Sequence, residues 1–131
     1  MTTVAAESPE SRFTRFLADI SERKRPILSP SRFAERMDLN VQSIAARARV
    51  HRNTVSRAPE SLAVQEYMRN VLRVLREAMD LTGGDINRSI IWFKNHPIAD
   101  FAYRTADDLV ADGKTDAVVN YLQSIRSGAT G

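Results

Sequence analysis

The sequence predicts an all-α protein, in which an N-terminal helix-turn-helix part is joined by a long helix to a small C-terminal helical domain. Three observations support this prediction. Helix start and stop signals recur along the chain, the apolar residues between them repeat at helical spacing, and one amphipathic stretch is long enough to connect two parts. With 131 residues, 43% of them hydrophobic, the chain is long enough to bury a core without cross-links.

The N-terminal part is predicted for residues 9 to 58, after a polar tail at residues 1 to 8. Ser8 and Ser29 each precede a proline, and a serine followed by proline is a frequent start of a helix. Two helices are therefore expected, each with one apolar face. The residues on these faces are Phe13, Phe16, Leu17, Ile20, Phe33, Ala34 and Met37.

A second motif follows Asn40, which can cap a third helix. Ala45 is small, Val50 lies in the following turn, and Val55 lies on the next helix. A helix-turn-helix needs a small residue where its helices approach and apolar residues on both sides of the turn. The spacing resembles the all-helical DNA-binding fold of Xre-type proteins, except that Arg49 occupies the turn position where most such motifs have glycine.

The helix around Val55 is the predicted recognition helix. If Val55 points inward, its neighbours face outward, where arginine can bind guanine or phosphate and asparagine can bind adenine. The predicted DNA-binding residues are Arg47, Arg49, His51, Arg52, Asn53, Thr54, Ser56 and Arg57, with Arg47 on the supporting helix placed for phosphate. The alternative is a solvated basic helix end without an operator.

Charge is unevenly distributed along the chain. Residues 1 to 58 carry a balance of +5 and residues 59 to 131 a balance of −2, within a net charge of +3. Such asymmetry favours a first half that faces nucleic acid, although a solvated basic surface gives the same pattern.

The connecting segment is predicted for residues 59 to 84 and contains the longest helix, which ends near Asp80 before Gly83 and Gly84. Its apolar positions are Val64, Tyr67, Met68, Val71, Leu72, Val74, Leu75, Ala78 and Met79. We expect Arg73 and Glu77 to form an i, i+4 ion pair on the solvent-exposed side of this helix. The apolar side is wide, so the helix is either a spine between the two parts or a dimerising helix.

Three further helices are predicted in the C-terminal domain, residues 85 to 131. Asp85 caps the first, which should stop near Asn95 because of Pro97. Its apolar residues Ile86, Ile90, Ile91, Trp92 and Phe93 are expected to be largely buried. Thr105 and Asp108 have the spacing of a capping box for the second helix, which Gly113 closes.

The last helix is predicted from Thr115 to Gly128. Its expected buried stripe is Ala117, Val118, Tyr121, Leu122 and Ile125.

The order of residues in this domain resembles that of a known family. The residues concerned are, in order, Trp92, Pro97, Thr105-Ala106, Leu109-Val110, Gly113, Val118, Tyr121-Leu122 and Gly128. Over roughly the last 45 residues, the chain resembles the toxin-binding domain of the Xre/MbcA/ParS antitoxin family. In this chain Ala106 stands where many relatives have proline, and Phe101-Ala102-Tyr103-Arg104 replaces a glycine-rich turn.

Members of that family neutralise RES-domain toxins that consume NAD. The resemblance therefore implies a type II antitoxin that blocks the NAD site of its cognate RES-domain toxin and represses its own operon by binding operator DNA. It also implies a homodimer within a hetero-oligomeric complex. The expected toxin-binding residues are Asn120, Gln123, Ser124, Arg126, Ser127 and Gly128.

Arg126 is expected to enter the NAD site of the toxin, because a site for a dinucleotide pyrophosphate attracts a cation. The simpler alternative is that Arg126 complements the C-terminal end of its helix. A second alternative for the whole chain is a stand-alone helix-turn-helix regulator with a C-terminal dimerisation domain.

An enzyme is not expected. The chain has no cysteine and no pairing of histidine with carboxylates, and we expect Asp107, Asp108, Asp112 and Asp116 to act as caps. His51 and His96 lack partners at ligand spacing, so neither a metal nor a cofactor is expected. Without a secretory or membrane-spanning run of apolar residues, we expect a soluble cytoplasmic protein with no membrane partner.

Overall fold

The computed structural model describes residues 7–128, and within this range every regular element is a helix. The all-α prediction is therefore confirmed. The elements are α1 Pro9–Ile20, α2 Pro30–Met37, α3 Val41–Ala48, α4 Arg52–Arg57, α5 Leu62–Leu81, α6 Ile86–Asn95, the 3₁₀ turn η1 Ala99–Phe101, α7 Ala106–Ala111 and α8 Thr115–Ser127.

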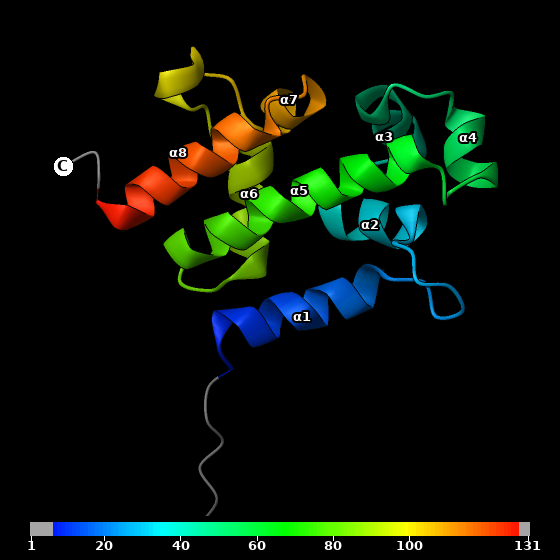
Figure 1. Cartoon of the computed structure of the whole chain (residues 1–131), viewed down its shortest axis with the longest axis horizontal. Coiled ribbons are helices and arrows are strands. Elements are labelled where there is room, and N and C mark those ends of the chain that lie inside the picture. Colours follow the sequence, from blue (N-terminus) through cyan, green and yellow to red (C-terminus); the bar gives the residue numbers. More distant parts are fainter. Residues whose placement is uncertain (1–6, 129–131) are drawn as a thin grey trace, which may run out of the picture.

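The long helix α5 lies at the centre of the molecule and packs against α1, α2, α3, α6, α7 and α8 (Figure 1). It contacts helices on both sides of it in the sequence. One continuous hydrophobic core contains side chains from both parts, including Phe16 and Phe33 from the N-terminal helices and Phe93 and Leu122 from the C-terminal ones. Burial of this shared core is the main stabilising contribution to the fold.

The predicted helix starts are confirmed where a side-chain cap was expected. The capping side chains of Ser8, Ser29, Asn40, Asp85 and Thr105 each accept a hydrogen bond from the backbone three residues later. Ser8, the last residue of the predicted tail, caps α1 as expected, because proline at N1 leaves the serine in the extended conformation of a cap. Residues 1–6 of the predicted tail lie outside the described residues.

The turn between η1 and α7 holds two non-glycine residues in a left-handed backbone conformation. Ala102 and Tyr103 have φ values of 56° and 63°, in the left-handed region that glycine adopts most easily. The turn is closed by the amide of Tyr103 donating to Ile98 O and the amide of Ile98 donating to Arg104 O, both at 2.9 Å. These backbone bonds hold two non-glycine residues in a costly conformation.

Burial of α6 and α8 differs from the expected pattern. In α6, Ile91 is 62% exposed and Trp92 is half-buried, because the helix buries only the side that carries Ser89, Ile90 and Phe93. In α8, Val118, Val119 and Leu122 are buried, whereas Ala117 and Ile125 are exposed. The buried stripe of α8 is thus rotated towards Val119, the side that packs against α5.

None of the helices in residues 7–128 is long and apolar enough to cross a membrane.

Candidate functional site

The first candidate surface is formed by α4 and the turn that precedes it. Ala45 of α3 and Val55 of α4 are both buried, and Val50 in the turn is half-buried, as the spacing of these residues predicted. The amide of Val50 donates to Ala45 O at 3.0 Å. Arg49 adopts a left-handed φ of 59° at the C-terminal end of α3, so the turn reverses there without glycine.

With Val55 facing inward, α4 presents its polar side chains to solvent. Arg52, Asn53, Ser56 and Arg57 are exposed, whereas Thr54 is half-buried. Neither Arg52 nor Arg57 has an ion-pair partner among residues 7–128. A hollow of about 410 Å³ lies between α4 and the start of α3, and its lining residues are Asn40, Val41, Gln42, Arg52, Asn53 and Ser56.

His51 has a structural contact at the start of α4. Its Nδ1 accepts a hydrogen bond of 3.1 Å from the amide of Asn53, which makes His51 the N-cap of the helix. The exposed ring therefore sits at the beginning of the predicted recognition helix, with Nδ1 engaged by the backbone.

Arg47 and Arg49 face the C-terminal part instead of the outer surface of α4. Arg47 Nε and Nη2 donate to the two carboxylate oxygens of Asp107, each at 2.7 Å. Arg49 Nη2 lies 3.8 Å from Asp112 Oδ1. In place of the predicted phosphate contact, Arg47 thus has an intramolecular partner. Asp107, expected to be a cap, is instead the buried half of this pair.

The Arg47–Asp107 pair lies beside a buried phenol. The hydrogen bond with Asp107 raises the pKa of Arg47, since it stabilises the charged guanidinium. Burial, and secondly the charge of Asp107, raises the pKa of Tyr67, whose hydroxyl has no hydrogen-bond partner among the described residues. These charged and polar groups join α3, α5 and α7.

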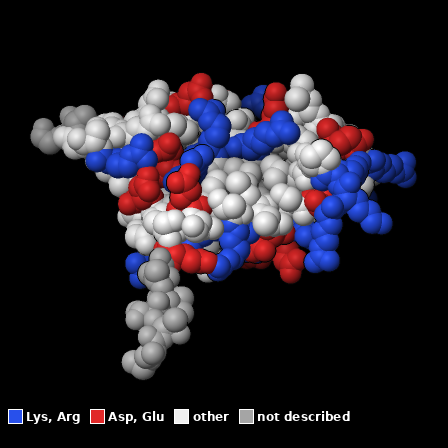
Figure 2. All heavy atoms as spheres, turned by 60° about the horizontal axis from the view of Figure 1, so that its bottom comes forward, with Lys and Arg blue, Asp and Glu red and all other residues white. Residues whose placement is uncertain are grey.

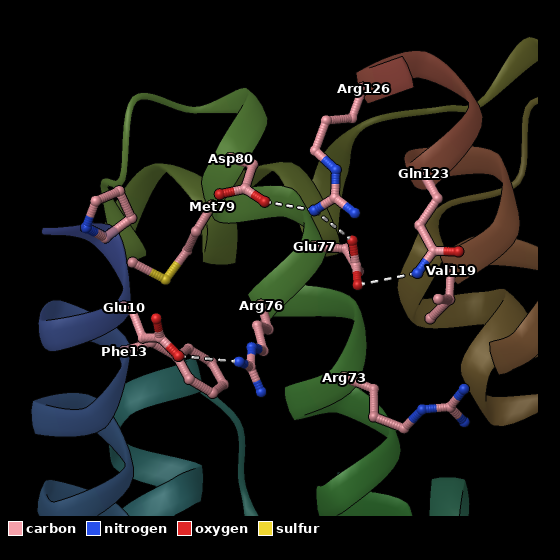
Figure 3. Close-up of a pocket in the computed structure, with 11 residues that line it drawn as sticks. Glu10, Phe13, Arg73, Arg76, Glu77, Met79, Asp80, Val119, Gln123 and Arg126 are labelled. Atoms are coloured by element: carbon pink, nitrogen blue, oxygen red, sulfur yellow. Dashed lines mark hydrogen bonds and ion pairs between the residues drawn. The ribbon is translucent and has the colours of Figure 1, made fainter. Parts of the chain in front are cut away.

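The second candidate site is a cleft of about 530 Å³ between α1, α5 and α8 (Figure 3). Figure 3 shows the side chain of Arg126 directed towards two acids of α5. Arg126 Nη1 lies 2.9 Å from Glu77 Oε2 and 2.5 Å from Asp80 Oδ2, and Gln123 Nε2 donates to Glu77 Oε1 at 3.2 Å. The hydrogen bond with Asp80 and the charge of Glu77 raise the pKa of Arg126.

The other cations of the cleft are also paired. Arg73 lies 2.9 Å from Asp116 and Arg76 lies 3.2 Å from Glu10. The predicted pair of Arg73 with Glu77 does not form, because both side chains find partners on other helices. The arrangement is therefore an internal ion-pair network that fastens α8 and α1 to α5, with a local charge close to neutral.

The expected toxin-binding residues fall into two groups. Gln123 and Arg126 line the cleft and bind α5. Asn120 is exposed on α8, Ser124 is half-buried, and Ser127 Oγ donates to Ser124 O at 3.0 Å near the helix end. Gly128 ends α8 with a φ of 73°, and residues 129–131 lie outside the described residues.

One exposed apolar surface was not predicted from the sequence. Ile91, Trp92 and Pro97 line a hollow of about 330 Å³, and the ring of Trp92 stacks on His96 at a centroid distance of 6.0 Å. A helical apolar repeat alone does not say which of several consecutive apolar residues stays outside. Arg88 and Asn95 complete the rim.

In the described part of the chain, no group of three or more histidine, aspartate or glutamate side chains is placed to hold a metal ion. A comparison of the chain with protein families, characterised proteins and solved structures gives no match.

Proposed function

We propose that this chain is an antitoxin of a type II toxin-antitoxin system, which binds operator DNA through α4 and the NAD site of a RES-domain toxin through the end of α8. The toxin class is suggested by the resemblance of the C-terminal segment to the Xre/MbcA/ParS family. Two separate surfaces of different chemistry, one cationic and one polar but nearly neutral, suit two different partners.

The observation that carries the proposal is the pairing of the arginines. On α5 and in the C-terminal domain, Arg73, Arg104 and Arg126 are each bound to carboxylates, whereas on α4 both Arg52 and Arg57 lack such a partner within the described range. Binding of nucleic acid exchanges counterions for protein cations, and a cation already held by a carboxylate contributes little to it. The unpaired arginines of α4 are therefore suited to phosphates and guanine edges.

Asn53, on the same helix, also suits DNA binding. It is exposed next to Arg52, and an asparagine amide can form two hydrogen bonds with adenine in the major groove. Because Arg47 and Arg49 lie towards α7, we leave them out of the proposed interface.

For the toxin, the exposed side of α8 supports a contact surface, with Asn120, Ser124 and Ser127 spaced along it. Arg126 is held by Glu77 and Asp80, and its insertion into a pyrophosphate site would require breaking both pairs. We therefore propose that Arg126 anchors α8, and that the outer polar residues and the segment after Ser127 contact the toxin.

The toxin half of the proposal is tested by co-expressing the chain with the protein encoded by the adjacent reading frame and measuring cellular NAD. Full-length chain should preserve NAD, and a chain lacking residues 128–131 should not. This truncation retains Arg126, so its melting temperature serves as the folding control. Full protection of NAD by the truncated chain would refute the role of the C-terminal segment.

A stand-alone DNA-binding regulator that dimerises through its C-terminal domain is the second candidate. The exposed apolar surface of Ile91, Trp92 and Pro97 favours it, because exposed apolar clusters often mark interfaces. Light scattering tests this surface: Ile91→Lys should convert a dimer to a monomer if it pairs two copies. Because the antitoxin is also expected to be a homodimer, protection of NAD is the result that favours the antitoxin.

A further inference from the structure

The connection between α1 and α2, residues 21–29, is a closed loop with a basic tip. Ser21 and Leu28 form an isolated antiparallel bridge, the amide of Glu22 donates to Ile27 O at 2.9 Å, and the amide of Ser29 donates to Ile20 O at 2.7 Å. These bonds close the base of the loop. Its tip, residues 23–26, is exposed and reads Arg-Lys-Arg-Pro.

The loop is fastened to the segment that follows α4 by one buried side chain. Gln65 of α5 accepts from the amide of Leu28 at 3.0 Å and donates to Leu28 O at 2.9 Å, and it also donates to Pro59 O at 2.8 Å. This side-chain amide is only 3% exposed, so its hydrogen bonds are shielded from water. The loop and the end of α4 are thereby held in a fixed relation, at the same end of the molecule (Figure 1).

The two acids near this loop both form an ion pair with the same arginine. Arg25 Nε lies 2.9 Å from Glu22, and Arg25 Nη1 lies 3.6 Å from Glu60 in the segment after α4. Arg23 and Lys24 are left without an ion-pair partner among residues 7–128, in the same condition as Arg52 and Arg57. Figure 2 shows Lys and Arg side chains gathered at this end of the molecule.

We infer that the loop of residues 21–29 is a second contact with duplex DNA, in which Arg23 and Lys24 bind backbone phosphates beside the groove that α4 enters. The inference rests on the proposed DNA binding by α4 and extends it to a segment 28 residues earlier in the chain than Arg52, counting from Lys24. Phosphate contacts fix the position and orientation of a protein on the duplex, while contacts with base edges provide specificity. A closed, anchored loop with two free cations suits the positioning role.

The chemistry of the loop tip favours phosphate over bases. Lysine is a flexible point charge, and neither Arg23 nor Lys24 has a neighbouring amide side chain on the loop that could read a base edge. The loop should therefore contribute equally to binding of any duplex sequence.

The test uses a fluorescently labelled duplex of random sequence and measures the dissociation constant by anisotropy over a series of salt concentrations. For Arg23→Ala with Lys24→Ala, the slope of log affinity against log salt should fall by roughly 0.9 per lost phosphate contact, or about 2 in all. The matched control removes Arg69 and Lys114, which are also exposed and lack an ion-pair partner in the described structure but belong to the C-terminal half. Its slope should stay close to that of the unaltered chain.

The outcomes separate the loop from α4. A wild-type slope in the loop variant, with a reduced slope in Arg52→Ala with Arg57→Ala, would overturn the loop contact and leave the proposed function in place. Equal reductions in the loop variant and in the matched control would also overturn it, since only net charge would then matter. Absence of duplex binding by the unaltered chain at low salt would overturn both proposals.

Discussion

Arg47 donates two hydrogen bonds of 2.7 Å to Asp107, and this pair joins α3 to α7 across 60 positions of sequence. The arginine side chain is 26% exposed and the aspartate side chain 9% exposed. Bidentate pairs of a guanidinium with a carboxylate are among the stronger polar contacts in proteins. The pair fixes the α3–α4 unit relative to the C-terminal helices.

We predict that Arg47→Ala and Asp107→Ala each lower the free energy of unfolding by about 2 kcal/mol, because each leaves a charged partner in a poorly hydrated place. The double variant should lose less than the sum of the two. Urea unfolding of the four proteins measures this coupling. The exposed pair of Arg73 with Asp116 is the matched control, with an expected coupling below about 0.5 kcal/mol. Strictly additive losses at Arg47 and Asp107 would show that the pair contributes no stability.

A second prediction concerns the buried phenol of Tyr67. Burial raises its pKa above the ordinary value of 10.0, so above pH 10 the unfolded chain loses this proton more readily than the folded one. Stability should therefore fall as pH rises, by up to about 1.4 kcal/mol per pH unit from this group. Tyr67→Phe should remove that slope.

At neutral pH the same substitution should cost little, because the hydroxyl has no partner among the described residues and its removal leaves no group newly unsatisfied. The measurement is the melting temperature of both proteins from pH 7 to alkaline values, with Tyr103→Phe as the exposed control. Parallel curves for the Tyr67 variant and the unaltered chain would contradict the prediction.

The turn after η1 offers a test of backbone strain. Ala102 is exposed with a φ of 56°, and Ala102→Gly should raise the free energy of unfolding by roughly 0.5 kcal/mol, because relief of left-handed strain exceeds the added freedom of the unfolded chain. Ala99→Gly, also exposed but within η1, should lower it by a similar amount. Thermal unfolding of the two variants is the comparison, and equal effects of the same sign would argue against strain at Ala102.

Helix starts could be predicted because their signals are local. Ser29, Asn40, Asp85 and Thr105 each cap a helix through a backbone amide three residues away, so the residues involved are visible in a short stretch of sequence. The stop at Asn95 follows in the same way from Pro97.

Contacts between distant segments could not be predicted in this way. Arg73 and Glu77 have the spacing of a helical pair, yet each binds a residue of α8 that lies far along the chain. The ion pair of Arg47 with Asp107 likewise depends on the packing of both α3 and α7 against α5. Residue type alone suggested a phosphate contact for Arg47, and only the fold shows that its charge is already satisfied.

The exposed arginines of α4 are the basis of the proposed DNA binding. The most direct measurement compares the affinity of the chain for a duplex from the region upstream of its own gene with its affinity for a random duplex, at one fixed salt concentration. The unaltered chain should prefer the upstream duplex, and Arg52→Ala with Arg57→Ala should weaken binding and reduce the preference. Equal weak affinity for both duplexes, unchanged by the two substitutions, would contradict the assignment of α4 as the DNA-binding surface.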